Sequence, residues 1–185
     1  MNNRLRAIVV GMAVASTAAM AAPAQASDGV SRPPESLGSG LYFVNHATGK
    51  CLEVSNNDGR NGARVQQWKC EDQDSAYWTS HYDDSTGENL YFFTPVSHPT
   101  KCLEIADYSK QNGAKAQLWD CVGQANAYWR WKDDRIDGVY RSFFVNLHSG
   151  KCLEIADANQ SNGAVAQQWD CVGQRNAFWD DKYQP

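Results

Sequence analysis

The stretch "KCLEIADYSKQNGAKAQLWDC" at residues 101–121 returns as "KCLEIADANQSNGAVAQQWDC" at residues 151–171. A more divergent copy, "KCLEVSNNDGRNGARVQQWKC", occupies residues 50–70. Each copy begins with Lys-Cys-Leu-Glu, contains Asn-Gly and ends with Gln-x-Trp-x-Cys. Identity extends past the stretch, because residues 101–129 and 151–179 share 21 of 29 positions. A fixed period of this kind predicts three copies of one structural unit.

Each unit has the pattern of several short strands. It opens on an aromatic strand, passes an Asn-Gly turn that favours positive φ, and closes on a strand through Trp78, Trp129 or Trp179. Helical periodicity is absent, so we expect an all-β fold, closed and threefold. The domain should cover residues 37–185, with repeats at about 40–89, 90–138 and 139–185. The three closing tryptophans should be core residues.

Six cysteines recur with the same period. They allow 15 disulfide connectivities, of which three respect the repeat symmetry. Pairing within a repeat closes a short loop around the Asn-Gly turn and is therefore preferred. The predicted bridges are Cys51–Cys70, Cys102–Cys121 and Cys152–Cys171.

The N-terminal residues predict export. Residues 1–26 have two arginines, an apolar run and a small-residue end, which is the pattern of a secretory signal peptide. Residues 27–36 are polar and proline-bearing, so we expect a flexible leader. Without residues 1–26 the chain has 15 basic and 21 acidic residues, a net charge of −6. That charge argues against a nucleic-acid partner, and no later stretch predicts membrane insertion.

The cysteine spacing also predicts which side chains share a face. If Cys102 and Cys121 face each other across a hairpin, Glu104 lies opposite Trp119, with Gln117 two residues further along. The same rule places Glu53 opposite Trp68 and Glu154 opposite Trp169. The other face would carry the core residues Leu103, Ile105, Ala116 and Leu118. A carboxylate, an indole and an amide would thus converge three times away from the core.

These motifs resemble the ricin-B-type β-trefoil lectins and the related bacterial carbohydrate-binding modules, over about residues 40–185. The resemblance implies a β-trefoil, an all-β fold of twelve strands in which three hairpins cap a six-stranded barrel. It also implies one shallow sugar site per repeat. The acid and amide would bind hydroxyl groups, and the indole would stack on the apolar face of a sugar. The implied carbohydrate-binding residues are Glu104, Gln117, Trp119 and Asn126 in repeat 2, Glu154, Gln167, Trp169 and Asn176 in repeat 3, and Glu53, Gln66 and Trp68 in repeat 1.

The repeats depart from the family pattern in two ways. Glu stands where the family usually has Asp, and Ala76, Ala127 and Ala177 stand where Gln usually follows Asn. Repeat 1 also has Ser75 in place of Asn. These changes indicate a site with a displaced acid and one amide fewer, so the sugar could be galactose-like or rhamnose-like.

The favoured interpretation is a secreted, multivalent lectin that binds terminal sugars through shallow sites in repeats 2 and 3, with repeat 1 as the weakest candidate. It needs no cofactor and is not an enzyme. One alternative is a trefoil that binds no sugar and acts as a protein-binding module or inhibitor. A secreted glycoside hydrolase is less favoured, because such enzymes need two carboxylates at one bond and each repeat supplies one. A metal site is also disfavoured, since the cysteines lack metal-ligand spacing. The sequence leaves the oligomeric state open.

Overall fold

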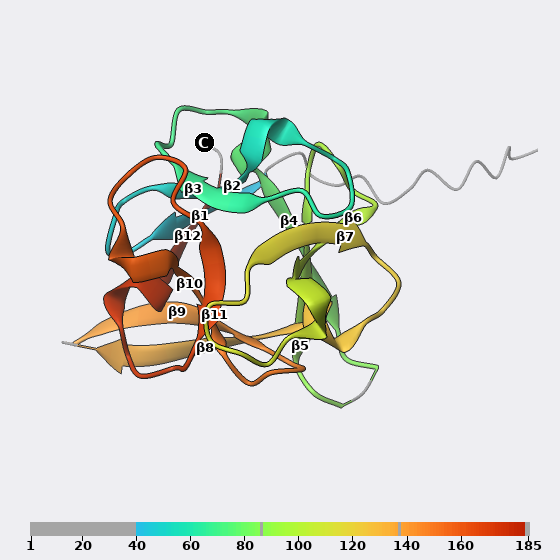
Figure 1. Ribbon diagram of the computed structural model, residues 1–185. Helices are drawn as coiled ribbons and strands as arrows, with labels where there is room; N and C mark the ends of the chain where they lie inside the picture. The colour runs from blue at the N-terminus through green and yellow to red at the C-terminus, as the bar shows by residue number, and fades with distance from the viewer. Residues whose placement is uncertain (1–39, 86, 137, 184–185) are drawn as a thin grey trace, which may run out of the picture. The chain divides into compact units, whose positions relative to one another are not determined.

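The computed structural model describes residues 40–85, 87–136 and 138–183. The predicted signal peptide at 1–26 and leader at 27–36 lie outside these residues. In the described part the chain forms twelve strands, four in each repeat (Figure 1). They are β1 Leu41–Asn45, β2 Cys51–Val54, β3 Val65–Trp68, β4 Trp78–Asp83, β5 Leu90–Pro95, β6 Lys101–Ile105, β7 Ala116–Asp120, β8 Trp129–Ile136, β9 Val139–Asn146, β10 Cys152–Ile155, β11 Ala166–Trp169 and β12 Trp179–Tyr183.

Six short 3₁₀ turns connect the strands in the described residues. Three follow the strands that begin each disulfide loop: η1 Ser55–Asn57, η3 Ala106–Tyr108 and η5 Ala156–Ala158. The others precede the closing tryptophans: η2 Asp74–Ala76, η4 Ala125–Ala127 and η6 Arg175–Ala177.

The first and last strands of every repeat form a closed barrel. Antiparallel pairing runs from β1 through β4, β5, β8, β9 and β12 and returns to β1. The remaining strands form three hairpins, β2–β3, β6–β7 and β10–β11. The predicted β-trefoil is confirmed.

The three predicted disulfides are confirmed as well. Each bridge spans 19 residues, and the Cα–Cα distances are 5.2, 5.1 and 5.2 Å for Cys51–Cys70, Cys102–Cys121 and Cys152–Cys171.

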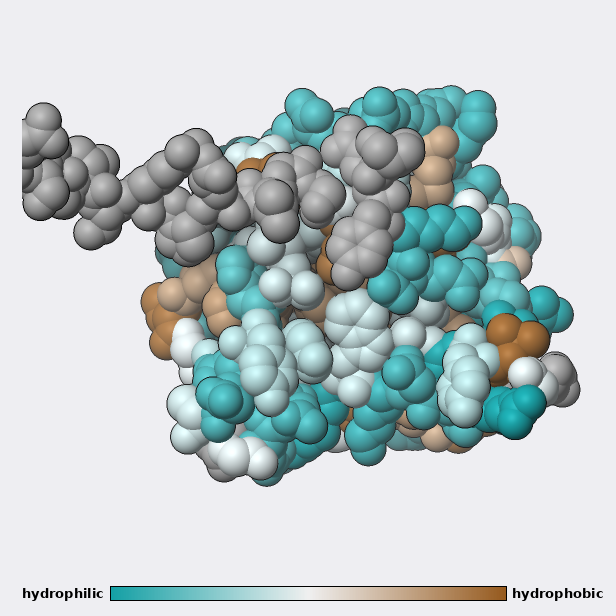
Figure 2. All heavy atoms as spheres, turned by 180° about the vertical axis from the view of Figure 1, so that it is seen from behind, coloured by the Kyte–Doolittle hydropathy of each residue, from teal (hydrophilic) through white to brown (hydrophobic). Residues whose placement is uncertain are grey.

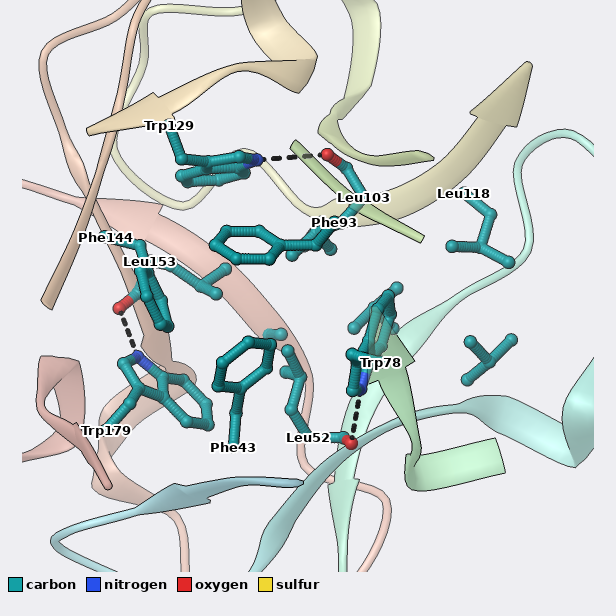
Figure 3. Close-up of a cluster of buried hydrophobic side chains, with 14 of the residues drawn as sticks. Phe43, Leu52, Trp78, Phe93, Leu103, Leu118, Trp129, Phe144, Leu153 and Trp179 are labelled. Atoms are coloured by element: carbon teal, nitrogen blue, oxygen red, sulfur yellow. Dashed lines mark hydrogen bonds between the residues drawn. The ribbon is translucent and has the colours of Figure 1, made fainter. Parts of the chain in front are cut away.

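Equivalent residues from the three repeats build the core. Each closing tryptophan is fully buried and donates its indole N–H to a backbone carbonyl of its own repeat (Figure 3). The donor–acceptor distances are 3.0 Å for Trp78 to Leu52, 3.1 Å for Trp129 to Leu103 and 3.1 Å for Trp179 to Leu153. The predicted core role of these tryptophans is therefore confirmed.

One side chain breaks the symmetry of this core. Phe43, Phe93 and Phe144 meet edge to face, with ring centroids 5.0–5.1 Å apart. Trp131 of β8 contacts all three rings, at centroid distances of 6.0, 6.2 and 5.1 Å. Ser80 and Asp181 occupy the equivalent positions in the other repeats, because each also lies opposite a core phenylalanine. One repeat thus supplies the large ring that covers the phenylalanine triad.

The repeats interlock through their Asn-Gly turns. Gly62 of repeat 1 donates its backbone N–H to Leu118 of repeat 2 at 2.8 Å. Gly113 donates to Gln168, and Gly163 donates to Gln67, both at 2.9 Å. Their φ angles lie between 81° and 83°, a region that glycine adopts without strain. The turns predicted from sequence therefore also join each hairpin to the next.

Candidate carbohydrate-binding site

Each candidate site is built on a hairpin whose register differs from the prediction by two residues. In β6–β7, Glu104 pairs with Gln117, and Trp119 pairs with Cys102. The prediction that Glu104 lies opposite Trp119 was therefore wrong. The reason is that Cys121 follows the end of β7, so the disulfide joins a strand to the segment beyond its partner. A shift of two keeps every side chain on its predicted face.

The other two hairpins have the same register, with Glu53 opposite Gln66 and Glu154 opposite Gln167. On the reverse face of β6–β7 the predicted core residues are buried, which confirms them: Leu103, Ile105, Ala116 and Leu118.

A buried carboxylate lies at the base of the site in repeat 2. Glu104 is 4% exposed. Its Oε1 accepts a hydrogen bond from Gln117 Nε2 at 2.9 Å. Its Oε2 accepts from Gln124 Nε2 at 2.8 Å and from Asn126 Nδ2 at 3.1 Å. Three amide donors thus stabilise the carboxylate where a buried charge would otherwise be costly.

The same network recurs in the other repeats. Three amides donate to Glu154, at 2.9, 2.9 and 3.1 Å from Gln167, Gln174 and Asn176. In repeat 1 the donors to Glu53 lie at 2.8, 3.2 and 2.9 Å and belong to Gln66, Gln73 and Ser75. The Ser75 hydroxyl therefore takes the position that Asn occupies elsewhere, and repeat 1 keeps a complete network.

Sequence reasoning missed the second glutamine of each network. This glutamine lies two residues before the Ser or Asn of each network: Gln73 before Ser75, Gln124 before Asn126 and Gln174 before Asn176. The family pattern instead has its glutamine directly after the Asn. The signal was present, because these glutamines recur at the same intervals as the cysteines. Each carboxylate therefore has two glutamine amides as donors, and the Asn amide is a third donor in repeats 2 and 3.

An exposed indole lies on the same hairpin face as each buried carboxylate. Trp68, Trp119 and Trp169 are 37%, 41% and 41% exposed, although each lies in a well-paired hairpin. In repeat 1, Trp68 and Glu53 line one pocket of about 320 Å³. In repeat 2, Trp119 and Glu104 line one of about 310 Å³. Each pocket combines a flat apolar surface with hydrogen-bonding groups, which suits a ligand with hydroxyl groups on an apolar ring.

The model of the ricin-type beta-trefoil lectin domain matches residues 40–179. The chain belongs to this lectin family. A comparison with curated protein sequences found no match.

Solved structures show the same ricin-type fold. A designed threefold-symmetric protein, ThreeFoil, is 30% identical with a TM-score of 0.68, and the match covers 76% of this chain and 96% of that one. An exo-beta-1,3-galactanase from Clostridium thermocellum is 24% identical with a TM-score of 0.70, over 78% of this chain but 30% of the enzyme. The C-half of the earthworm R-type lectin, in complex with GalNAc, is 15% identical with a TM-score of 0.56, over 79% and 99%.

One atom of the candidate site in repeat 2 is left without a partner among the described residues. Asn126 is 3% exposed, and its Nδ2 donates to Glu104 and, at 2.7 Å, to the Ile105 carbonyl. Its Oδ1 is buried and has no hydrogen-bond partner among the described residues. An unsatisfied acceptor of this kind costs about 1–3 kcal/mol.

Residues 40–85, 87–136 and 138–183 contain no cluster of histidine, cysteine or acidic side chains arranged to hold a metal ion. Within the same ranges, no helix has the length and apolar composition needed to span a membrane.

Proposed function

We propose that this protein is an exported lectin that binds terminal sugars through shallow sites, one on each hairpin. The observation that carries the proposal is the threefold combination of a buried, amide-held carboxylate and an exposed indole. Family membership supports a carbohydrate-binding role. Repeats 2 and 3 have the full set of Glu, two Gln, Asn and Trp, and repeat 1 has Ser in place of Asn.

The chemistry of a pyranose fits this arrangement. Its hydroxyl groups can donate to the remaining lone pair of the carboxylate Oε1, which accepts one bond within the protein. Its C–H face can pack on the indole. A galactose-like or rhamnose-like terminal sugar remains the proposed ligand class. The earthworm lectin half in complex with GalNAc supports the first of these.

Several weak sites on one domain would act together. A shallow single site is expected to bind in the millimolar range, about −4 kcal/mol. Two or three such sites on one domain can engage neighbouring glycan ends, so that the overall affinity for a dense glycan surface rises about 10²-fold or more. The predicted signal peptide and the three disulfides support export.

Two other functions remain alternatives. A protein-binding trefoil would need a docking surface. The described residues visible in Figure 2 are mostly hydrophilic, with hydrophobic residues in small separate patches, so that face offers no broad apolar area. A glycoside hydrolase needs two carboxylates that flank one bond. Asp107 does line the repeat 2 pocket with Glu104, but three amides within the protein already bond to Glu104. The match to the galactanase covers 30% of that enzyme and does not carry its activity over to this chain.

A glycan array tests the proposal. The protein without residues 1–26 is compared with a Trp68→Ala/Trp119→Ala/Trp169→Ala variant and with Tyr140→Ala, which removes a 73% exposed aromatic residue from β9. We expect the unmodified protein and the Tyr140 control to label one family of glycans and the triple variant to label none. If no glycan is labelled while the protein is folded, or if the triple variant still binds, the proposal fails. N-terminal sequencing of the exported protein tests cleavage after Ala26.

A further inference from the structure

The third position of the turn that follows the first hairpin strand carries a different residue in each repeat. That position is Asn57 in repeat 1, Tyr108 in repeat 2 and Ala158 in repeat 3. Tyr108 is 51% exposed and lines the same pocket of about 310 Å³ as Trp119 and Glu104. The pocket of repeat 2 therefore has two aromatic residues in its lining.

The backbone at this position adopts a conformation that most residues avoid. Tyr108 has a φ of 52° and follows Asp107 at 58°, and the equivalent pairs in the other repeats are also left-handed. Left-handed φ is uncommon for residues other than glycine, and for a bulky side chain it persists where the surroundings hold it. The fold thus presents the side chain of residue 108 from a fixed, uncommon backbone geometry.

A histidine from the next repeat holds Tyr108 in place. His148 lies in the loop between β9 and β10. Its Nε2 is 3.0 Å from the Tyr108 carbonyl oxygen, and the two ring centroids are 3.7 Å apart. Repeat 1 has the same support, with His98 Nε2 at 2.9 Å from the Asn57 carbonyl oxygen. Both histidine side chains are half-buried in these contacts.

Repeat 3 lacks both parts of this arrangement. Ala158 replaces the tyrosine, and Ala47 of repeat 1 stands where His148 stands for repeat 2. The equivalence is visible in the hydrogen bonds: the backbone N–H of Ala47 donates to Asn45 Oδ1 at 3.1 Å, as that of His148 donates to Asn146 Oδ1 at 3.1 Å. Gln160 reaches the Ala47 carbonyl from the repeat 3 loop at 3.4 Å. Repeat 2 alone combines the histidine support with an aromatic side chain.

We propose that Tyr108 is a specificity-determining residue that makes repeat 2 the strongest site and adapts it to the last two rings of a glycan. The terminal ring would stack on Trp119 above Glu104, and the second ring would pack on Tyr108. His148 is a positioning residue for Tyr108 and touches no sugar. The inference rests on the proposed lectin function.

The test begins with a protein in which repeat 2 is the sole intact site, Trp68→Ala/Trp169→Ala. Titration calorimetry measures four ligands: galactose and lactose, and rhamnose and the rhamnosyl-glucose disaccharide rutinose. We expect one disaccharide to bind more tightly than its monosaccharide. Adding Tyr108→Ala should weaken the disaccharide about tenfold, within the range of one aromatic contact, and change the monosaccharide less than twofold. Alanine already occupies this position in repeat 3, so the variant should fold.

Two further variants separate contact from positioning. His148→Ala should reduce the disaccharide preference severalfold while leaving the unfolding midpoint close to that of the parent. His98→Ala, which removes the equivalent support from Asn57 of repeat 1, should not alter the site of repeat 2. A gain-of-function variant is made in a Trp68→Ala/Trp119→Ala parent, in which repeat 3 is the remaining intact site. Adding Ala47→His/Ala158→Tyr should raise the disaccharide affinity of repeat 3 about tenfold, compared with the parent or with the parent carrying Ala158→Tyr alone.

The outcomes are distinguishable. If none of the four ligands and no arrayed glycan binds, the proposed function itself fails. If a sugar binds but Tyr108→Ala lowers monosaccharide and disaccharide affinity equally, or lowers neither, the inference is overturned while the lectin function stands.

Discussion

Replacing Glu104 by Gln tests whether the buried carboxylate stabilises the fold. Glu104 accepts three hydrogen bonds from amides, and bonds to a charged acceptor are worth about 1 kcal/mol more each than neutral ones. The new side-chain amide must also point its NH₂ group at one of the donors. Gln117 can turn to accept from it, since Glu104 is its side chain's one partner among the described residues. The other two bonds become neutral.

The expected loss is about 2–3 kcal/mol of unfolding free energy, out of about 5–15 kcal/mol for a typical domain. Urea unfolding under oxidising conditions measures it, and the melting temperature should fall by about 5–10 °C. Glu71→Gln is the matched control, because Glu71 is exposed and pairs with Lys69 at the surface. It should cost less than about 0.5 kcal/mol. If Glu104→Gln costs no more than this control, the network does not stabilise the fold, and the reasoning is refuted.

Two further substitutions test single contacts. Trp129→Phe removes the donor to the buried Leu103 carbonyl and leaves a small cavity. The free energy of unfolding measured by urea titration should therefore fall by about 2–4 kcal/mol. An unchanged midpoint would contradict the core role of that bond. Hydrogen bonds from the Arg60 side chain and backbone hold the pKa of Asp58 down to about 2, against a usual 3.8. Arg60→Ala should let this pKa rise part of the way in an NMR titration, because the backbone N–H of residue 60 still donates. A carboxyl group whose pKa is lower in the folded state than in the unfolded state stabilises the fold at pH values above its unfolded-state pKa. The small contribution of Asp58 to the free energy of unfolding is therefore lost as the pH falls from about 4 toward 2, and Arg60→Ala should lose less stability over this range.

The fold was predictable because its determinants are periodic in the sequence. A strand pattern, an Asn-Gly turn, a cysteine pair and a closing tryptophan recur three times, and each of these patterns predicts one local structure. The placement of Trp78 in the core followed from that recurrence and from hydrophobicity alone. Within the site, the face shared by Glu104, Gln117 and Trp119 was also predictable, since side-chain alternation in a strand depends only on parity.

What could not be predicted depends on contacts between segments. The two-residue register error arose because cysteine spacing does not say whether a disulfide joins paired residues or reaches beyond a strand end. Gln124 reaches Glu104 from the segment after the hairpin, and His148 reaches Tyr108 from another repeat. The recurrence of Gln124 at the repeat interval is visible in the sequence, but the contacts that Gln124 and His148 make depend on how the segments and repeats pack.

Because Trp131 contacts all three phenylalanines of the core, the three repeats cannot all carry a tryptophan at its position. A side chain that contacts all three phenylalanines lies where the repeats converge, and three identical side chains of that size would compete for the same space. Trp131 can be large because Ser80 and Asp181 are small. An assembly of three identical copies of repeat 2 would therefore have three indoles where this chain has one. Fusion of the repeats into a single polypeptide is what allows one position to differ while the rest of the repeat is preserved.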